Sequence, residues 1–539
     1  MDNRQIADRL DAFASLLDLG DANPYTARAY HRAAETIRAA ALPVADLIRS
    51  GRARELRGIG PGIEARLREL VETGEIAELA ELERELAPDL VGLGRYLGLG
   101  ARRSVELARA LGVRNADELR EAAAAGRLRS VAGIGPKTEA RLLEALDREP
   151  DLRPRRGLLL NRAWELVGGI AAALEGEPAG DVRRWRDSCE RLAVVCAASN
   201  PAPLLARFAE LSQIVALIDQ DDRRAIGVTV EGVPVELVVA HPGRFGTELV
   251  RATGSPEYVA ALGPLPDGPD EQAVYRALGI PWCPPELREE PFRGAPPALV
   301  GLDDIRGDLH CHSTWSDGRA SVEEMGRAAR ESGYEYLAIC DHTPAVGAVR
   351  GLTPEDVRRQ AEEVAAANEE LAPFRVLRGI ECDILPDGRL DLPDDVLAEL
   401  DWVQTSVHGG QRMPRRELTK RVEEALRNPF VRCLSHPKGR LINRRPENAL
   451  DLERVFEVAR EEGVALEVNG LPDRLDLRGE HVRDALKAGV EIVCSTDAHS
   501  VRGLSNMALS VATARRGWAT AADVLNTRPL PALLAGRRA

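Results

Sequence analysis

The stretch "RGDLHCHSTWSD", Arg306 to Asp317, is the part of this 539-residue sequence that decides its fold. It predicts a strand in which His310 and His312 project from one face, because side chains alternate along a strand, and Asp317 follows in the next loop. From about Leu302 onward, short apolar runs like this one alternate with amphipathic helical stretches. This alternation predicts a β/α domain with ligands at the strand ends.

More metal-type residues occupy the ends of the later apolar runs. In order they are His342 in "LAICDHTP", Glu381 in "VLRGIECDIL", His408 in "WVQTSVHGG", His436 in "VRCLSHPKGR", and Asp497 and His499 in "EIVCSTDAHS". A lone histidine at a strand end is usually a packed or surface residue, but six of the nine histidines recur at the same end here. The pattern predicts a multinuclear metal site, and imidazoles mixed with carboxylates suit Zn, Mn or Fe better than Mg alone.

The N-terminal region carries a repeat of a different kind. A Gly-apolar-Gly turn opens a helix at Gly58, at Gly98 and at Gly133, with spacings of 40 and 35 residues. Such turns place backbone N–H groups at a helix N-terminus, which favours a phosphate whatever the base sequence. One copy is usually just a turn, whereas three in register predict helix-hairpin-helix binding of the DNA backbone. The DNA-binding candidates are Gly58, Gly60, Gly98, Gly100, Gly133, Gly135 and Lys137.

Composition limits the partners and the compartment. The formal net charge of −14 argues against nonspecific coating of nucleic acid by the whole chain, although residues 91–148 hold eleven basic and seven acidic groups. No run of about 18 apolar residues and no secretion signal is present, so we expect a cytoplasmic protein that does not span a membrane. The eight cysteines are scattered and read as reduced core residues. The oligomeric state is left open.

The metal-type residues resemble those of the polymerase and histidinol phosphatase (PHP) family across roughly residues 306–526. The resemblance implies a distorted (β/α)7 barrel with three divalent ions that hydrolyses phosphoesters. By that resemblance, His310, His312, Glu381 and Asp497 hold one metal; Glu381 bridges to a second held by His408 and His436; Asp317, His342 and His499 hold the third. Lys438 and Arg440, in "HPKGR", are candidates for a substrate phosphate contact, with plain surface charge as the alternative.

Nearly the whole chain also resembles the bacterial family X DNA polymerases. Landmarks outside the barrel include "NPYTARAYHRAA", "VEGVPVELVV", "RATGSPEY" and "VYRALGIPWCPPELRE". The resemblance implies a multidomain protein: all-α helix-hairpin-helix bundles, a central α+β nucleotidyltransferase palm and the α/β barrel. The expected boundaries are 1–88 for the first helical domain, 89–152 for the second and third hairpins, 153–298 for the palm and thumb-like domain, and 299–539 for the PHP domain.

The palm departs from that family at its metal site. The family pattern places an Asp-x-Asp pair on a strand, but in "AGDVRRWRDSCERLAVVCAA" (179–198) those positions read Arg191 and Ala193, and Asp181 replaces a serine. Glu236 stands where a third aspartate is expected, and the segment after "ATGS" is short. An arginine repels divalent ions, so the sequence predicts a degenerate palm without polymerase activity. Arg183 and Arg184 read either as remaining DNA-backbone contacts or as surface charge.

These observations predict a DNA-binding, metal-dependent phosphoesterase: a 3'-5' exonuclease or 3'-end-processing nuclease of DNA repair, acting on gapped DNA or 3' ends. One alternative is a phosphatase for a small phosphorylated metabolite such as histidinol phosphate. A second is a non-catalytic DNA-binding scaffold, and residual polymerase activity is a third.

Overall fold

The computed structural model consists of two compact units, residues 1–155 with 200–239, and residues 156–199 with 240–539. It describes residues 157–229 and 231–535 and, before them, 24–38, 40, 43–56, 58–74, 76–78, 110–113, 116–131, 134–136 and 138–140, together with residues 3, 6, 7, 9, 10, 13, 14, 107 and 142. The predicted palm segment 153–298 contributes to both units, so the four-domain division stays a prediction. Within the described residues, no helix combines the length and the apolar character needed to cross a membrane.

The larger unit contains a parallel sheet of seven strands. In spatial order these are β8 (Gly307–Cys311), β9 (Tyr336–Ile339), β10 (Arg375–Asp383), β11 (Trp402–Ser406), β12 (Cys433–Leu434), β13 (Ala465–Asn469) and β14 (Ile492–Ser495). An isolated parallel bridge joins Cys311 to Ala498, just beyond β14, and brings the two edge strands together. The sheet is therefore a nearly closed barrel, which confirms the predicted fold of this region.

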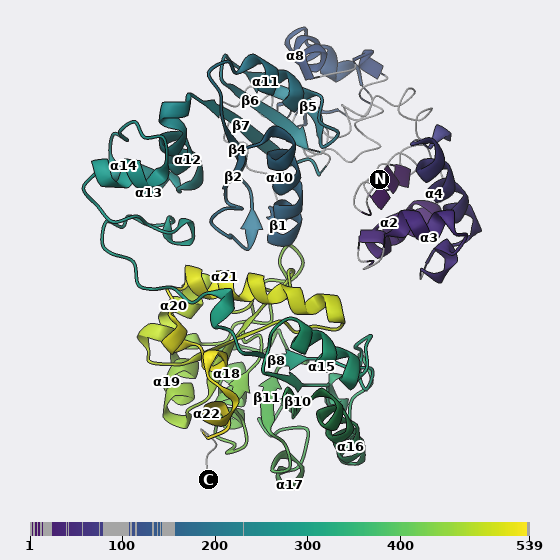
Figure 1. Ribbon diagram of the computed structural model, residues 1–539, viewed down its shortest axis with the longest axis vertical. Coiled ribbons are helices and arrows are strands. Elements are labelled where there is room, and N and C mark those ends of the chain that lie inside the picture. The colour runs from purple at the N-terminus through teal and green to yellow at the C-terminus, as the bar shows by residue number, and fades with distance from the viewer. Residues whose placement is uncertain are drawn as a thin grey trace. The chain divides into compact units, whose positions relative to one another are not determined.

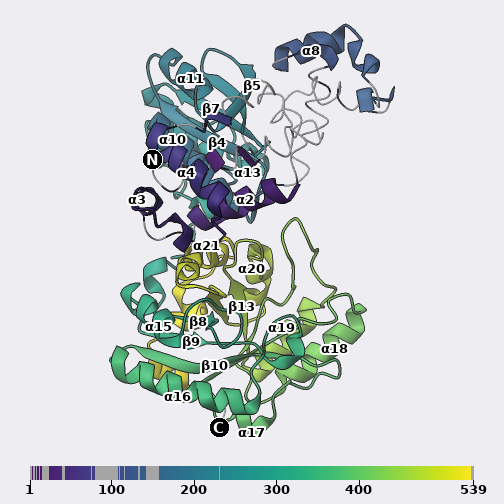
Figure 2. The same ribbon diagram turned by 90° about the vertical axis from the view of Figure 1, so that its right-hand side faces the viewer.

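Helices alternate with these strands along the chain and lie around the outside of the barrel (Figure 1; Figure 2). They are α15 (Val322–Glu331), α16 (Pro354–Leu371), α17 (Asp394–Leu397), α18 (Arg415–Leu426), α19 (Leu452–Glu462), α20 (Gly479–Lys487), α21 (Met507–Arg516) and α22 (Leu530–Ala535). Apolar faces of helix and strand form one core, in which Leu418 and Val422 of α18 share a cluster with Val403 of β11. This packing leaves the strand ends free to carry polar groups.

A smaller α+β segment packs in the same unit as the barrel. It contains β1 (Leu158–Leu159), α10 (Leu160–Leu174), β2 (Glu177–Gly180), β3 (Ser188–Cys189), β4 (Leu192–Ala197), α12 (Phe245–Thr253), α13 (Pro256–Leu262) and α14 (Glu271–Ala277). β2 and β4 pair antiparallel, with Gly180 opposite Leu192. A Cβ at Gly180 would lie 2.2 Å from the Arg191 carbonyl oxygen, and the residue has φ of 74°, so this turn requires glycine.

The turn between β2 and β3, within the stretch 179–198 of the predicted palm, is held together by ion pairs. Asp181 accepts backbone N–H groups from Glu190 and Arg191 at 2.7 and 2.8 Å and pairs with Arg184, which is buried. Arg183 donates to Glu271 at 2.7 and 3.1 Å. Neither arginine fits the two interpretations made from sequence, surface charge or DNA contact, because both satisfy buried or half-buried carboxylates of the same unit.

The other unit contains the helices α2 (Pro24–Arg38), α3 (Val44–Arg49), α4 (Pro61–Thr73) and α8 (Ala116–Ala124), together with α11 (Ala202–Ala209) and an antiparallel meander of β5 (Ile214–Gln220), β6 (Arg224–Thr229) and β7 (Pro234–Ala240). Glu236, at the predicted third carboxylate position, accepts the Nε–H of Arg224 at 2.7 Å. This carboxylate is thus already paired with a cation.

The first predicted hairpin and part of the third fall in described residues, and the described parts have the same local structure. The N–H of Ile59 bonds to the carbonyl of Leu56, as that of Ile134 bonds to Val131, and the helix N–H of Glu64 bonds to Gly60, as that of Glu139 bonds to Gly135. An ion pair between residues ten positions apart also recurs, as Arg54–Glu64 and as Arg129–Glu139. The repeat is therefore real in three dimensions. Gly98, Gly100, Gly133 and Lys137 lie outside the described residues.

Candidate metal centre

The nine predicted ligand residues lie at the carboxyl ends of the barrel strands. His310 belongs to β8, Glu381 to β10, and the others follow the ends of β8, β9, β11, β12 and β14. Two of them, His436 and Asp497, have positive φ angles of 26° and 53°, a conformation that costs a non-glycine residue free energy. Such strain recurs where a site needs a side chain in a fixed direction.

One group of ligand atoms gathers around His312. Its Nε2 lies 3.1 Å from His310 Nε2 and 3.1 Å from Asp497 Oδ1, and His310, His312 and Asp497 together offer three atoms to one ion. Glu381 Oε2 lies 3.5 Å from His310 Nε2 and 3.7 Å from His312 Nε2. These four residues are the set that the family resemblance assigned to the first metal.

A second group surrounds Glu381. Its Oε1 lies 2.9 Å from His436 Nε2 and 3.7 Å from His408 Nε2, while its Oε2 lies 2.9 Å from His342 Nδ1. His342, Glu381 and His408 are close enough to share an ion. The carboxylate of Glu381 therefore lies between two groups of imidazoles, which is the position a bridging ligand requires.

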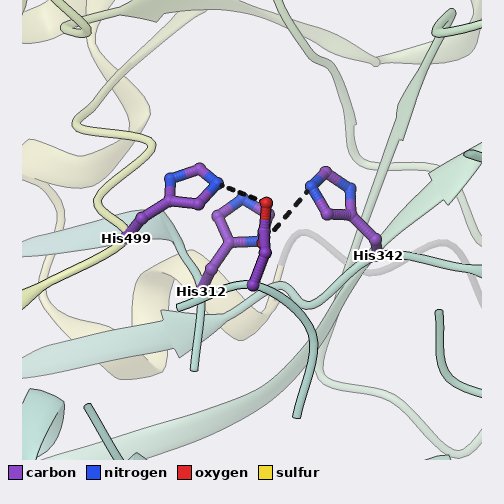
Figure 3. A group of neighbouring side chains, drawn as sticks. His312, His342 and His499 are labelled. Atoms are coloured by element: carbon purple, nitrogen blue, oxygen red, sulfur yellow. Dashed lines mark ion pairs between the residues drawn. The ribbon is translucent and has the colours of Figure 1, made fainter. Parts of the chain in front are cut away.

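A third group consists of Asp317 and three histidines, His312, His342 and His499, which Figure 3 labels. His499 Nε2 lies 3.3 Å from Asp317 Oδ2, and His342 Nε2 lies 3.7 Å from Asp317 Oδ1. His312 completes the group, with its ring stacked on that of His499 at a centroid distance of 4.2 Å. His312 and His342 thus appear in two groups each, and the nine side chains form one continuous cluster.

The unpaired atoms of this cluster fit metal ions. Both carboxylate oxygens of Glu381, Nδ1 of His312 and Nδ1 of His342 are buried and make no hydrogen bond of good geometry, although His342 and His436 lie within ion-pair distance of Glu381. A buried charged oxygen without a partner is costly unless a cation satisfies it. Imidazole nitrogens and carboxylate oxygens are together the donors that Zn, Mn and Fe accept.

The electrostatic environment of the cluster shifts the pKa values of its imidazoles in different directions. Burial and the neighbouring His499 and His342 lower the pKa of His312 to about 3, so this ring is neutral, as a metal ligand must be. Burial opposes a charge on Glu381, but His408, His342 and His310 outweigh it and hold the pKa of this carboxyl well below its ordinary value. Burial also opposes a charge on His310, but Glu467, Asp497 and Glu381 outweigh it and raise the pKa of this imidazole.

Sequence reasoning missed a layer of buried polar residues behind the ligands. Glu467 of β13 accepts from His310 Nδ1 at 2.5 Å, from the Ser495 hydroxyl at 2.6 Å and from the His436 backbone N–H at 2.6 Å. Asn469 donates to Asp497 Oδ2 at 2.9 Å, and Asp383 lies 3.2 Å from His408 Nδ1. Such partners fix the orientation of ligating side chains. The available signal was a carboxylate inside the apolar run "GVALEVNG".

Lys438 and Arg440, the predicted phosphate contacts, already have internal acceptors. The Lys438 ammonium donates to the carbonyls of Asn448 and Leu450 at 2.7 and 3.0 Å, and burial lowers its pKa. Arg440 donates to two carbonyls and to Asp187. We therefore leave both residues out of the proposed substrate contacts.

A barrel with this ligand set at its strand ends defines the PHP class of metal-dependent phosphoesterases. The family model described as "PHP domain" matches residues 308–470, "Helix-hairpin-helix domain" matches residues 1–76, and "SAM-like Helix-hairpin-helix tandem" matches residues 97–148. The chain is 35% identical, over 98% of both chains, to the DNA polymerase/3'-5' exonuclease PolX of Bacillus subtilis (strain 168). It therefore belongs to the bacterial PolX family, as the sequence predicted.

Other relatives match a smaller part of the chain. A probable phosphatase of Acetivibrio thermocellus is 34% identical over 36% of this chain and 78% of its own length. A probable phosphatase of Thermoanaerobacter sp. (strain X514) is 27% identical over 41% of this chain and 89% of its own length. Both relatives are shorter than this chain, because the aligned segment covers most of each of them and less than half of this chain.

Proposed function

We propose that this protein is a metal-dependent phosphoesterase that removes nucleotides from DNA 3' ends, as a 3'-5' exonuclease or 3'-end-processing nuclease of DNA repair. The observation that carries the proposal is the cluster of nine predicted ligand residues gathered around the buried carboxylate of Glu381. Three divalent ions of Mn, Zn or Fe fit the three groups. The cytoplasm is the compartment in which we expect the protein to act.

The chain's own residues determine how a phosphodiester approaches. Six of the nine ligand side chains are at most 8% exposed, whereas Asp317 and His499 are 28% and 32% exposed. The side of the centre that solvent reaches is therefore at Asp317 and His499, whereas Glu467 is fully buried. Bound divalent ions supply an activated water and neutralise charge on the reacting phosphate. Asp497 and Glu381 hold the negative charge that keeps those ions in place.

The hairpins support DNA as the substrate. Gly60 begins α4 with Pro61 at the first helical position, and a Cβ built on Gly58 or Gly60 meets no atom within 4 Å. An open helix N-terminus of this kind accepts a phosphate oxygen. Repetition of the same turn at Gly135 supports backbone binding without sequence preference, at gaps or 3' ends.

The palm supports loss of polymerisation. Arg191 is exposed and Ala193 is buried at the two aspartate positions, and Glu236 is paired with Arg224. Nucleotidyl transfer needs carboxylates that hold two Mg ions, and the described residues offer none at these two positions. We infer that no primer extension occurs.

A specific observation favours one alternative, a phosphatase for small phosphate monoesters. The relatives called probable phosphatases align with about 36–41% of this chain. The hairpin domains favour DNA over this alternative, and an experiment separates the two.

The test uses purified full-length protein with Mn, 5'-labelled gapped DNA with and without dNTPs, and histidinol phosphate in parallel. We expect stepwise shortening of the 3' end that Asp497→Ala and His499→Ala abolish, while His481→Ala, a histidine outside the cluster, retains it. Primer extension, or turnover of histidinol phosphate without DNA shortening, would overturn the proposal. DNA binding without any hydrolysis would leave only the scaffold interpretation.

A further inference from the structure

The guanidinium of Arg440 joins three segments of the larger unit. Its Nη1 lies 2.6 Å from Asp187 Oδ2, its Nε donates to the carbonyl of Arg474 at 2.8 Å, and its Nη2 donates to the carbonyl of Leu475 at 2.5 Å. Arg440 is 8% exposed, so these contacts are screened little by water. One residue of the palm stretch, Asp187, is the carboxylate at the end of this network.

Both loops held by Arg440 reach the metal centre. The loop after β12 contains both Arg440 and, four residues earlier, His436. The Nε2 of His436 lies 2.9 Å from Glu381 Oε1. The loop after β13 contains Arg474, whose Nε lies 3.7 Å from Asp497 Oδ2. Among the described residues, Arg474 is the one arginine that an ion pair joins to a predicted ligand. Movement of either loop would therefore displace a group at the centre.

Asp187 is fixed from the opposite direction as well. Arg516 of α21 lies 4.0 Å from its Oδ1 and also donates to the carbonyl of Trp185 at 3.5 Å. Burial opposes a charge on Asp187, but Arg440 and Arg516 outweigh it and lower the pKa of this carboxyl. A second bond joins the same segments, because Asn443, in the loop after β12, donates to the carbonyl of Gly157 at 2.9 Å.

We propose that Asp187 is a positioning residue of the phosphoesterase, which acts through Arg440 to hold the loops after β12 and β13 at the metal centre. The inference rests on the proposed function. It gives the degenerate palm segment a role in the surviving chemistry, because a carboxylate beside its former catalytic strand supports ligands on the barrel. A barrel without residues 157–199 would lack this support.

The test compares full-length Asp187→Asn and Asp187→Glu with Glu290→Gln. The control removes the charge from a different ion pair of the larger unit, that of Glu290 with Arg483 of α20 at 2.9 Å, which includes no residue of either loop. Three quantities are measured: the affinity for Mn by titration calorimetry, hydrogen exchange of residues 436–448 and 470–477, and kcat and KM for bis(p-nitrophenyl) phosphate.

We expect Asp187→Asn to weaken Mn binding about 10-fold or more, as loss of a supporting partner does in other metal sites, and to accelerate exchange of both loops. Asp187→Glu should recover most of the affinity, and Glu290→Gln should stay within about twofold of the wild type. Unchanged affinity and exchange in Asp187→Asn would overturn the inference, as would an equal loss in Glu290→Gln. If the wild type binds Mn but hydrolyses neither DNA nor the diester, the proposed function fails, and affinity and exchange still decide the role of Asp187.

Discussion

At the residue scale, Glu381 is the carboxylate on which the centre depends. Its two oxygens lie within 4 Å of nitrogen atoms from five histidines, His310, His312, His342, His408 and His436. No direct hydrogen bond satisfies either oxygen. A carboxylate in this position acts through its negative charge, because that charge attracts both protonated imidazoles and metal ions.

Glu381→Gln keeps the shape of this side chain but removes the charge. We expect loss of at least one equivalent of bound metal and a fall in hydrolysis of more than about 100-fold, because among the described residues Glu381 is the carboxylate within 4 Å of both His342 and His436. Metal content by elemental analysis and turnover of bis(p-nitrophenyl) phosphate check this. Full metal occupancy in the variant would contradict the bridging position.

Glu467→Gln tests the layer behind the ligands. Glu467 is buried and contacts His310 Nδ1, but it is not one of the nine predicted ligands. We expect a loss of about 10- to 100-fold in metal affinity or activity, smaller than that of Glu381→Gln. Equal losses in the two variants would indicate that Glu467 itself binds a metal.

The sequence pointed to the nine residues that the structure brings together, but not to the buried residues behind them, for a physical reason. His310, His312 and Asp497 stand at the ends of apolar runs, where parallel strands must bring polar groups to one edge. Glu467 lies within a strand, 157 residues from its partner His310, and no local pattern encodes such a pairing. The internal acceptors of Arg440 are largely backbone carbonyls, which leave no signal in the side-chain pattern.

At the scale of elements, a buried ion network holds α14 against the palm turn. Glu271 accepts two bonds from Arg288, at 2.6 and 3.0 Å, and two from Arg183. Burial opposes the charge of Glu271, but the two arginines outweigh it and lower its pKa to about 2 from the ordinary 4.5. A carboxyl whose folded-state pKa is depressed stabilises the fold above the unfolded-state pKa, and this contribution is lost as the pH falls from 4.5 toward 2.

Glu271→Gln should therefore lower the free energy of unfolding by about 3–5 kcal/mol near neutral pH, since it leaves the buried Arg288 without its counter-ion. The loss relative to the wild type should shrink as the pH falls through this window. Urea midpoints of both proteins between pH 7 and pH 3 measure the difference. A loss that stays constant with pH would contradict the ionised state of Glu271.

The hairpin elements offer a substitution that separates DNA binding from folding. Gly60 precedes α4, has an ordinary φ of −87° and has open space at its Cβ, so Gly60→Asp fits and adds a favourable N-cap. Its charge occupies the expected phosphate position. We expect an unchanged or raised melting temperature with weaker DNA binding, whereas the neutral cap Gly60→Asn retains binding. Fluorescence anisotropy with a gapped duplex measures both, and equal affinity in the two variants would place DNA elsewhere.

At the scale of the whole molecule, the family match and the candidate site differ in extent: the match covers nearly the whole chain, and the site lies in the barrel. The chain aligns with a DNA polymerase/3'-5' exonuclease over nearly its whole length, and the clusters of metal-type residues found among the described residues all lie in the barrel. Residues 156–199 form one compact unit with that barrel.

Salt dependence distinguishes binding by the hairpins from binding by the centre. Contacts between backbone phosphates and the hairpins release counter-ions, so DNA shortening at subsaturating DNA should fall steeply and log-linearly between about 50 and 200 mM salt. Bis(p-nitrophenyl) phosphate contacts the metal centre alone, and its turnover should change little over the same range. Gly60→Asp should reduce DNA shortening, flatten its salt slope and leave diester turnover intact. If shortening and diester turnover share one salt dependence, the metal centre holds DNA without the hairpins.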